Sequence, residues 1–179
     1  MLPLMIAIDA LVVTMSPALS ALFVYDRQLI ESGELWRMVT AHLVHFSVSH
    51  LFFDLCGFLL SAWYCHRRGY RQAPWVIASA ALATTGAIFL LQPDMARYGG
   101  LSGVADALIV FAAVRGMAEK GGMRWPSLTV LIACCGNIGF QLLSDRGTLE
   151  ALAGQPFVPA AGAHLVGAIV GAAVAAATS

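Results

Sequence analysis

The chain has 179 residues, of which 59% are hydrophobic and only 11% are charged, and its formal net charge is zero. A soluble domain of this size needs more polar residues to cover its core. The ten basic residues are balanced by ten acidic ones, so nothing in the composition argues for nucleic-acid binding. One compact helical membrane domain covering residues 1–179 is the class that the composition favours.

Six apolar stretches follow one another along the chain, each close to the length that crosses the hydrocarbon of a bilayer. The first is interpreted as a retained span, because no positively charged segment precedes it as in a signal peptide. The last is rich in Gly and Ala, which let helices approach closely. We therefore expect an all-α bundle of six transmembrane helices, at residues 2–24, 50–66, 75–92, 102–118, 126–143 and 162–178.

The basic residues predict the orientation of these spans. They are concentrated in two connections, the one after the second span and the one after the fourth. Because cytoplasmic loops carry an excess of Lys and Arg, both connections and both termini are expected in the cytoplasm. The long segments 25–49 and 144–161 then face outward. The residues that carry this prediction are Arg67, Arg68, Arg71, Arg115, Lys120 and Arg124.

Three histidines and an aspartate lie in and after the first long loop, at His42, His45, His50 and Asp54. His50 and Asp54 are four residues apart and share one face of the second span. Their spacing fits no familiar metal-ligand pattern, so we expect neither a metal nor another cofactor. His42 and His45 are interpreted as loop and interface residues.

Ser102 follows two glycines at the start of the fourth span, within the segment Gly100-Leu101-Ser102-Gly103. The first turn of a helix has N–H groups without a helical partner, and these can hold an anion. A serine at that point is well placed to attack a carbonyl carbon. The same position is also typical of an ordinary N-cap serine.

His164 begins the last span, where a histidine at membrane depth is costly and usually has a partner or a task. Asp106 lies four residues after Ser102, on the same helical face, and could reach toward His164. Asp9, Asp54 and Asp106 are the three carboxylates within predicted spans, and each should face the bundle interior or be protonated. A serine and a histidine in one bundle suggest a nucleophile and its base.

These motifs, taken together, resemble the rhomboid family of intramembrane serine proteases. The resemblance covers most of the chain, in order: Trp36-Arg37 in the long first loop, His45 and His50, Gly100-Leu101-Ser102-Gly103, and Ala163-His164-x-x-Gly167. The compact size is most similar to the bacterial rhombosortase subgroup. That likeness implies an integral protein of the bacterial inner membrane, with its active site opening outward. Its partners would be membrane-anchored protein substrates, including those that end in Gly-Gly, a helix and a basic tail.

The resemblance also implies roles for single residues. Ser102 would be the nucleophile and His164 the general base, with the oxyanion held by the Ser102 backbone N–H and by His50. An asparagine commonly follows that histidine by four residues in the family, whereas this chain has Asp54. An ionised carboxylate only accepts hydrogen bonds, so Asp54 could donate only when protonated. Gly100 and Gly103 would support the same site.

Asp106 is a second departure, because many rhomboids carry a tyrosine there. We interpret Asp106 as an orienter of His164, like the acid of a Ser-His-Asp triad. An aspartyl or zinc protease is disfavoured, because the motifs Gly-x-Gly-Asp and His-Glu-x-x-His are absent. Two functions without proteolysis stay open: an inactive rhomboid-like binder of transmembrane helices, and a small proton-coupled transporter. The oligomeric state is not predicted.

Overall fold

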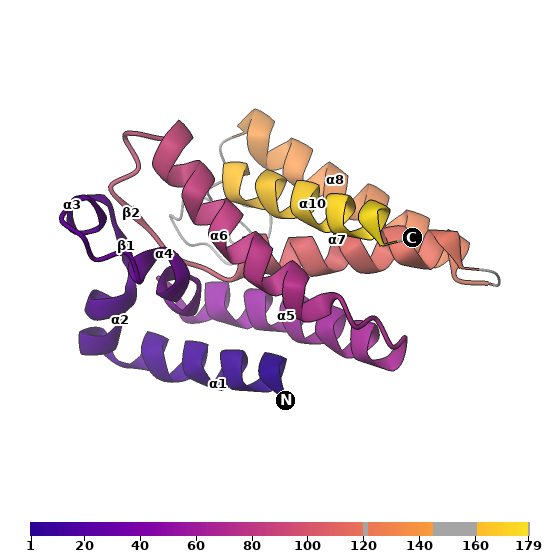
Figure 1. Ribbon diagram of the computed structural model, residues 1–179, viewed down its shortest axis with the longest axis horizontal. Coiled ribbons are helices and arrows are strands. Elements are labelled where there is room, and N and C mark those ends of the chain that lie inside the picture. Colours follow the sequence, from indigo (N-terminus) through magenta and orange to yellow (C-terminus); the bar gives the residue numbers. More distant parts are fainter. Residues whose placement is uncertain (120–121, 145–160, 179) are drawn as a thin grey trace.

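The computed structural model describes residues 1–119, 122–144 and 161–178, and the structural statements below concern these residues (Figure 1). They form a helical bundle with one short antiparallel strand pair. The helices are α1 (Leu2–Met15), α2 (Pro17–Phe23), α3 (Arg27–Glu31), α4 (Arg37–Thr40), the 3₁₀ turn η1 (Ala41–Leu43), α5 (Val48–Arg67), α6 (Ala73–Leu91), α7 (Ser102–Ala118), α8 (Arg124–Ser144) and α10 (Ala161–Ala177). The strands are β1 (Tyr25–Asp26) and β2 (Arg97–Tyr98).

Each of the six predicted spans coincides with a long helix to within about three residues, except the first. By length and apolar composition, three described helices can cross a membrane, namely α5, α6 and α8. A fourth is added if α1 and α2 together make one span. The helices α7 and α10 have 17 residues each, and the six-span count stays a prediction.

The first predicted span, residues 2–24, is wrong as a continuous helix. The chain bends by 113° between α1 and α2. Ser16 has an extended backbone and its hydroxyl accepts a hydrogen bond from the Leu19 N–H, while Pro17 takes the first position of α2. A serine cap followed by proline is a helix start, and proline at that point ends the preceding helix. Hydropathy averaged over a window does not register this break.

Helix α7 is the centre of the bundle, with α5, α6, α8 and α10 packed around it (Figure 1). Its contact with α10 is backbone to backbone. A Cβ on Gly167 would lie 1.9 Å from the Gly103 carbonyl oxygen, and one on Gly171 would lie 2.1 Å from that of Ala107. Only glycine fits at these two positions, which explains the small residues of the last span.

The first long loop closes one end of the bundle. Strand β1 pairs with β2, so that Tyr25 lies opposite Tyr98. The guanidinium of Arg27 donates to the last carbonyls of α6, and buried Arg37 donates to the Ala21 and Val24 carbonyls at the end of α2. These bonds satisfy carbonyls that the helix ends leave without a helical partner. The loop is therefore tied to the segment that leads into Ser102.

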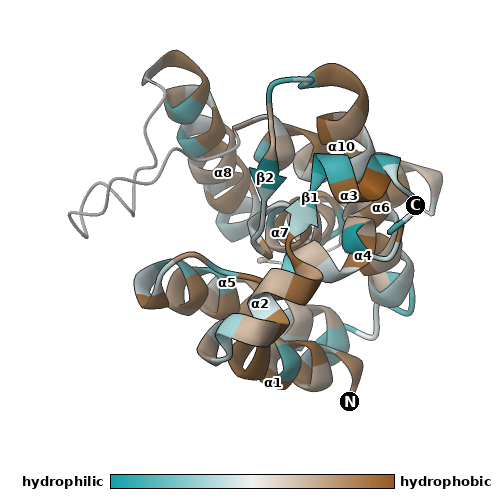
Figure 2. Ribbon diagram, turned by 90° about the vertical axis from the view of Figure 1, so that its left-hand side faces the viewer, coloured by the Kyte–Doolittle hydropathy of each residue, from teal (hydrophilic) through white to brown (hydrophobic). Residues whose placement is uncertain are grey.

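The outer surface of the bundle is apolar, as expected for a protein in lipid. Large hydrophobic side chains that are at least half exposed occur on α1, α5, α6 and α8, among them Leu4, Leu60, Leu90, Ile132 and Leu143. Hydrophilic residues gather instead around the short elements β1, β2 and α3 at one end (Figure 2). Lipid tails can accept such a surface and water cannot, so the chain is an integral membrane protein.

Candidate active site

A glycine loop leads from β2 into α7 and determines where Ser102 lies. Gly100 has φ of +135°, a conformation that favours glycine, and a Cβ there would lie 2.9 Å from the His50 ring. A Cβ on Gly99 would lie 2.8 Å from the Val44 carbonyl oxygen. The Gly100 N–H donates to the Ala41 carbonyl at 3.2 Å. The loop is thus pressed against the first long loop on one side and α5 on the other.

Ser102 is the first residue of α7, and Leu101 occupies the cap position. No side-chain hydrogen bond caps this helix, so Ser102 does not act as the N-cap serine that its sequence position allows. Gly103 follows, where a Cβ would lie 2.9 Å from the Ala163 carbonyl of α10. This glycine lets the start of α10, and with it His164, approach the serine turn.

Ser102, Asp106 and His164 line one cavity of about 330 Å³. Its walls come from α5, α7, α8 and α10, so four segments far apart in the sequence meet there. Apolar side chains such as Ile109 and Val130 make up much of the lining. A largely apolar cavity with a few convergent polar groups is the usual form of a binding or catalytic site.

Asp106 and His164 are in direct contact across this cavity. The Nδ1 atom of His164 lies 2.7 Å from Oδ2 of Asp106, and each side chain is 13% exposed. The thiol of Cys134 on α8 is 3.8 Å from the other oxygen of Asp106. When Nδ1 carries the proton that Asp106 accepts, Nε2 is the ring nitrogen able to take a proton. The contact between Asp106 and His164, which the position of Asp106 one turn after Ser102 suggested, is therefore present.

Asp54 lies at the centre of a polar cluster behind the serine loop. Its Oδ2 accepts the backbone N–H of Leu101 at 2.8 Å and lies 3.1 Å from Nε2 of His45 and 3.3 Å from Nε2 of His50. The Leu101 N–H can only donate, so this oxygen acts as an acceptor. Asp54 also lines the 330 Å³ cavity, and it links α5 to the residue before Ser102.

His42 and His45 lie in the first long loop, as predicted, but they are not interface residues, because both are buried behind the serine loop. The His42 ring faces the Ala81 carbonyl at 2.9 Å and the Gly100 carbonyl at 3.1 Å. Burial lowers the pKa of His42, although both carbonyls favour its charged form. Three histidines within nine residues were the available signal of a buried polar cluster.

Asp54→Asn is expected to leave the free energy of unfolding within about 1 kcal/mol of the native value, because an amide oxygen still accepts the Leu101 N–H. Asp54→Ala removes that acceptor and should cost about 2 kcal/mol. Chemical unfolding in detergent measures both values, with Asp9→Ala, an exposed carboxylate on α1, as the control. If Asp54→Asn loses as much unfolding free energy as Asp54→Ala, the serine loop requires the negative charge of Asp54 and not only a hydrogen-bond acceptor.

The remaining candidate residues differ in how they lie relative to Ser102. Asp9 lines a separate cavity, so the three carboxylates of the spans do not meet. Asn137 and Gln141, four residues apart on α8, also line the cavity of Ser102. Among the described residues no group of three or more His, Cys, Asp or Glu could hold a metal ion. The segment 144–161, predicted to face outward, lies outside the described residues apart from its ends.

Comparison of the sequence with known proteins assigns the chain to a family. The family model described as "Rhomboid domain" matches residues 32–179, which include the histidine cluster, the serine loop and α10. No curated protein matches the chain. Rhomboid proteins are typically intramembrane serine proteases that act on membrane proteins within the bilayer. With most of its length matched, the chain belongs to the rhomboid family.

Proposed function

We propose that this protein is an active intramembrane serine endopeptidase in which Ser102 is the nucleophile and His164 the general base. The observation that carries the proposal is the 2.7 Å contact between His164 Nδ1 and Asp106 Oδ2, in the cavity that Ser102 also lines. An inactive binder of helices has no need for a carboxylate that orients a histidine beside a serine. A transporter is disfavoured because Asp9 lies apart from Asp54 and Asp106.

In the proposed reaction, Ser102 Oγ attacks the carbonyl carbon of a peptide bond while Nε2 of His164 takes the hydroxyl proton. The Ser102 backbone N–H stabilises the oxyanion. His50, which packs on Gly100 and whose Nε2 lies 3.3 Å from Asp54 Oδ2, becomes the second donor when its Nε2–H turns from Asp54 to the oxyanion. The C–N bond then breaks and the proton passes from His164 to the departing amine. Water hydrolyses the acyl-enzyme, giving its proton to His164, which returns a proton to Ser102 Oγ.

Three sets of residues support these steps without reacting. Asp106 holds the imidazole in the tautomer that leaves Nε2 as the base, and stabilises the imidazolium that forms. Asp54 holds the Leu101 N–H and so fixes the backbone before the nucleophile. Gly100 and Gly103 permit the close approach of His50 and α10. The mechanism uses no cofactor or metal.

The proposed substrates are proteins anchored in the same bilayer, cleaved in or near their transmembrane helix. A helix must unwind locally before its peptide bond can be attacked, which favours Gly-rich segments. The resemblance to the rhombosortase subgroup extends the proposal to substrates ending in Gly-Gly, a helix and a basic tail. The basic residues in and beside the α5–α6 and α7–α8 connections support a bacterial inner-membrane orientation with both termini cytoplasmic and the serine nearer the outer face.

Reconstitution with a tagged substrate tests this function. The native protein in liposomes should cleave a single-span substrate that carries Gly-Gly, an apolar helix and a basic tail, and should cleave the same substrate with Leu-Leu much more slowly. Ser102→Ala should leave both intact, as read by gel and mass spectrometry of the products. Cleavage that persists in Ser102→Ala, or none in the native protein across a panel of single-span substrates, would reject the proposal.

A further inference from the structure

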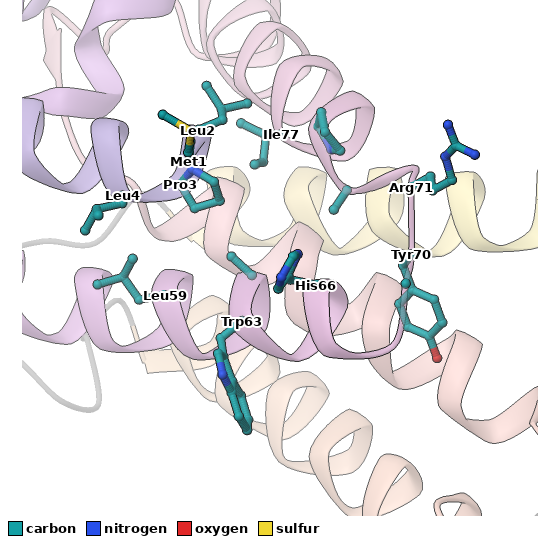
Figure 3. A pocket seen from close by; sticks show the side chains of 14 residues that line it. Met1, Leu2, Pro3, Leu4, Leu59, Trp63, His66, Tyr70, Arg71 and Ile77 are labelled. Atoms are coloured by element: carbon teal, nitrogen blue, oxygen red, sulfur yellow. The ribbon is translucent and has the colours of Figure 1, made fainter.

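A second cavity lies away from Ser102, between the first turns of α1, the C-terminal half of α5 and the start of α6 (Figure 3). Its volume is about 660 Å³, within the range of roughly 300–1,000 Å³ that small-molecule sites occupy. Ser102, Asp106 and His164 do not line it. The proposed proteolysis therefore makes no use of this cavity.

The residues that line this cavity are apolar at one end and basic at the other. Leu4 and Leu59 lie at one end of the lining, Ile77 and His66 lie nearer its middle, and Arg71 lies at the opposite end with its guanidinium extending outward (Figure 3). Leu4 is 60% exposed on the outer face of α1, so the apolar side is continuous with the lipid-facing surface. A ligand that matches this cavity has an apolar chain and a polar head.

The polar side lies where a membrane–water interface is expected. Trp63, Trp75 and Trp125 come from the end of α5 and the first turns of α6 and α8, and each is more than 60% exposed. Exposed tryptophans that gather at one level of a helix bundle mark the headgroup region of a bilayer. The exposed arginines Arg67 and Arg71 flank the connection at the same end. The head of the ligand would therefore lie among phospholipid headgroups.

Charge selects the kind of headgroup. The neighbouring Arg68 pairs with Glu119, whereas none of the ion pairs found among the described residues includes Arg71. A guanidinium beside a cavity at this level attracts a phosphate, and prefers a lipid whose head carries net negative charge. Free anions match the charge but not the apolar side.

We propose that this cavity binds one anionic phospholipid, with its phosphate beside Arg71 and an acyl chain along Leu4, Leu59 and Ile77. The bound lipid fills the space between α1 and the α5–α6 pair. It holds the start of α1 against the bundle without taking part in the reaction. This inference does not depend on the proposed protease activity.

Native mass spectrometry of the whole protein tests the proposal. The protein in neutral detergent is incubated with phosphatidylglycerol and phosphatidylcholine of equal chain length, one of them deuterated. We expect one retained lipid and a preference for phosphatidylglycerol of roughly fivefold, the factor for one basic residue at an anionic headgroup. Arg71→Gln should abolish the preference, whereas Arg67→Gln, equally exposed but outside the cavity, should keep it.

A second variant tests the apolar side. Leu4→Trp fills the space for the chain at an exposed position and should reduce retention of both lipids, while thermal unfolding in detergent shows that each variant is folded. Retention of no lipid by the native protein, or of both lipids equally, would overturn the proposal. If Arg67→Gln and Arg71→Gln lose the preference for phosphatidylglycerol equally, the proposal is also rejected. That result would indicate that the lipid is attracted by the general positive charge near the α5–α6 connection and not by Arg71 at the cavity.

Discussion

Ser102→Ala and His164→Ala are each expected to abolish labelling of the purified protein by a fluorophosphonate probe and to lower substrate turnover by at least about 10⁴-fold. The probe reacts only with a serine whose proton is removed by a neighbouring base, and Ser102 has His164 in its cavity. Members of such a catalytic unit act together, so removing either one costs nearly as much as removing both. In-gel fluorescence gives the labelling, and a fluorogenic single-span substrate gives the turnover.

The chain offers a matched control for the serine substitution. Ser79→Ala removes an exposed hydroxyl on α6 that bonds only carbonyls of its own helix, and it should label like the native protein. If His164→Ala labels at the native rate while Ser102→Ala does not, Ser102 is reactive without this base and the dyad is wrong.

Asp106→Asn is expected to lower kcat by about 10³- to 10⁴-fold with little change in KM. The carboxylate accepts from His164 Nδ1, whereas an asparagine amide can rotate to donate to that nitrogen. The proton then lies on Nε2, which can no longer take the proton of Ser102 Oγ. Loss of the same order follows when the acid of a Ser-His-Asp triad is replaced by asparagine.

Turnover measured at saturating substrate, together with thermal unfolding in detergent, separates this role from a structural one. Asp106→Asn should unfold within a few degrees of the native protein, because size and hydrogen-bonding capacity are kept. Asp9→Asn, a carboxylate change on α1 outside the cavity, should leave kcat unchanged. Native turnover in Asp106→Asn would make the observed contact a packing hydrogen bond and leave Ser102 and His164 as a plain dyad.

The long helices were accessible to prediction because lipid imposes a simple rule on the chain. Every backbone group must be bonded within the segment, so a long apolar stretch must be a helix of matching length. The predicted fourth span, 102–118, coincides with α7. The rule fails at Ser16 and Pro17, where two short helices replace one span and local capping decides against the average hydropathy. The serine-proline pair was a readable signal of that break.

The site was predictable in part. The spacing of Ser102 and Asp106 within one helix places them on one face, and helical geometry alone suffices for that inference. The contact of Asp106 with His164 spans 58 residues of sequence and depends on how α10 packs against α7. That packing needs Gly103 and Gly167 to bring two backbones together. No sequence pattern within α7 or α10 predicts which other helix its small residues will pack against.

The histidine cluster also separates what the sequence determines from what the tertiary structure decides. The sequence by itself determined that this is a helical membrane protein with a serine at a helix start, a histidine in another span and a carboxylate one turn after the serine. Only the tertiary structure decided that Asp54 accepts the Leu101 N–H, that His42 and His45 are buried behind the serine loop, and that Asp9 stands apart. Local helix formation follows from hydropathy and spacing, whereas contacts between distant segments follow from side-chain shape across the whole bundle.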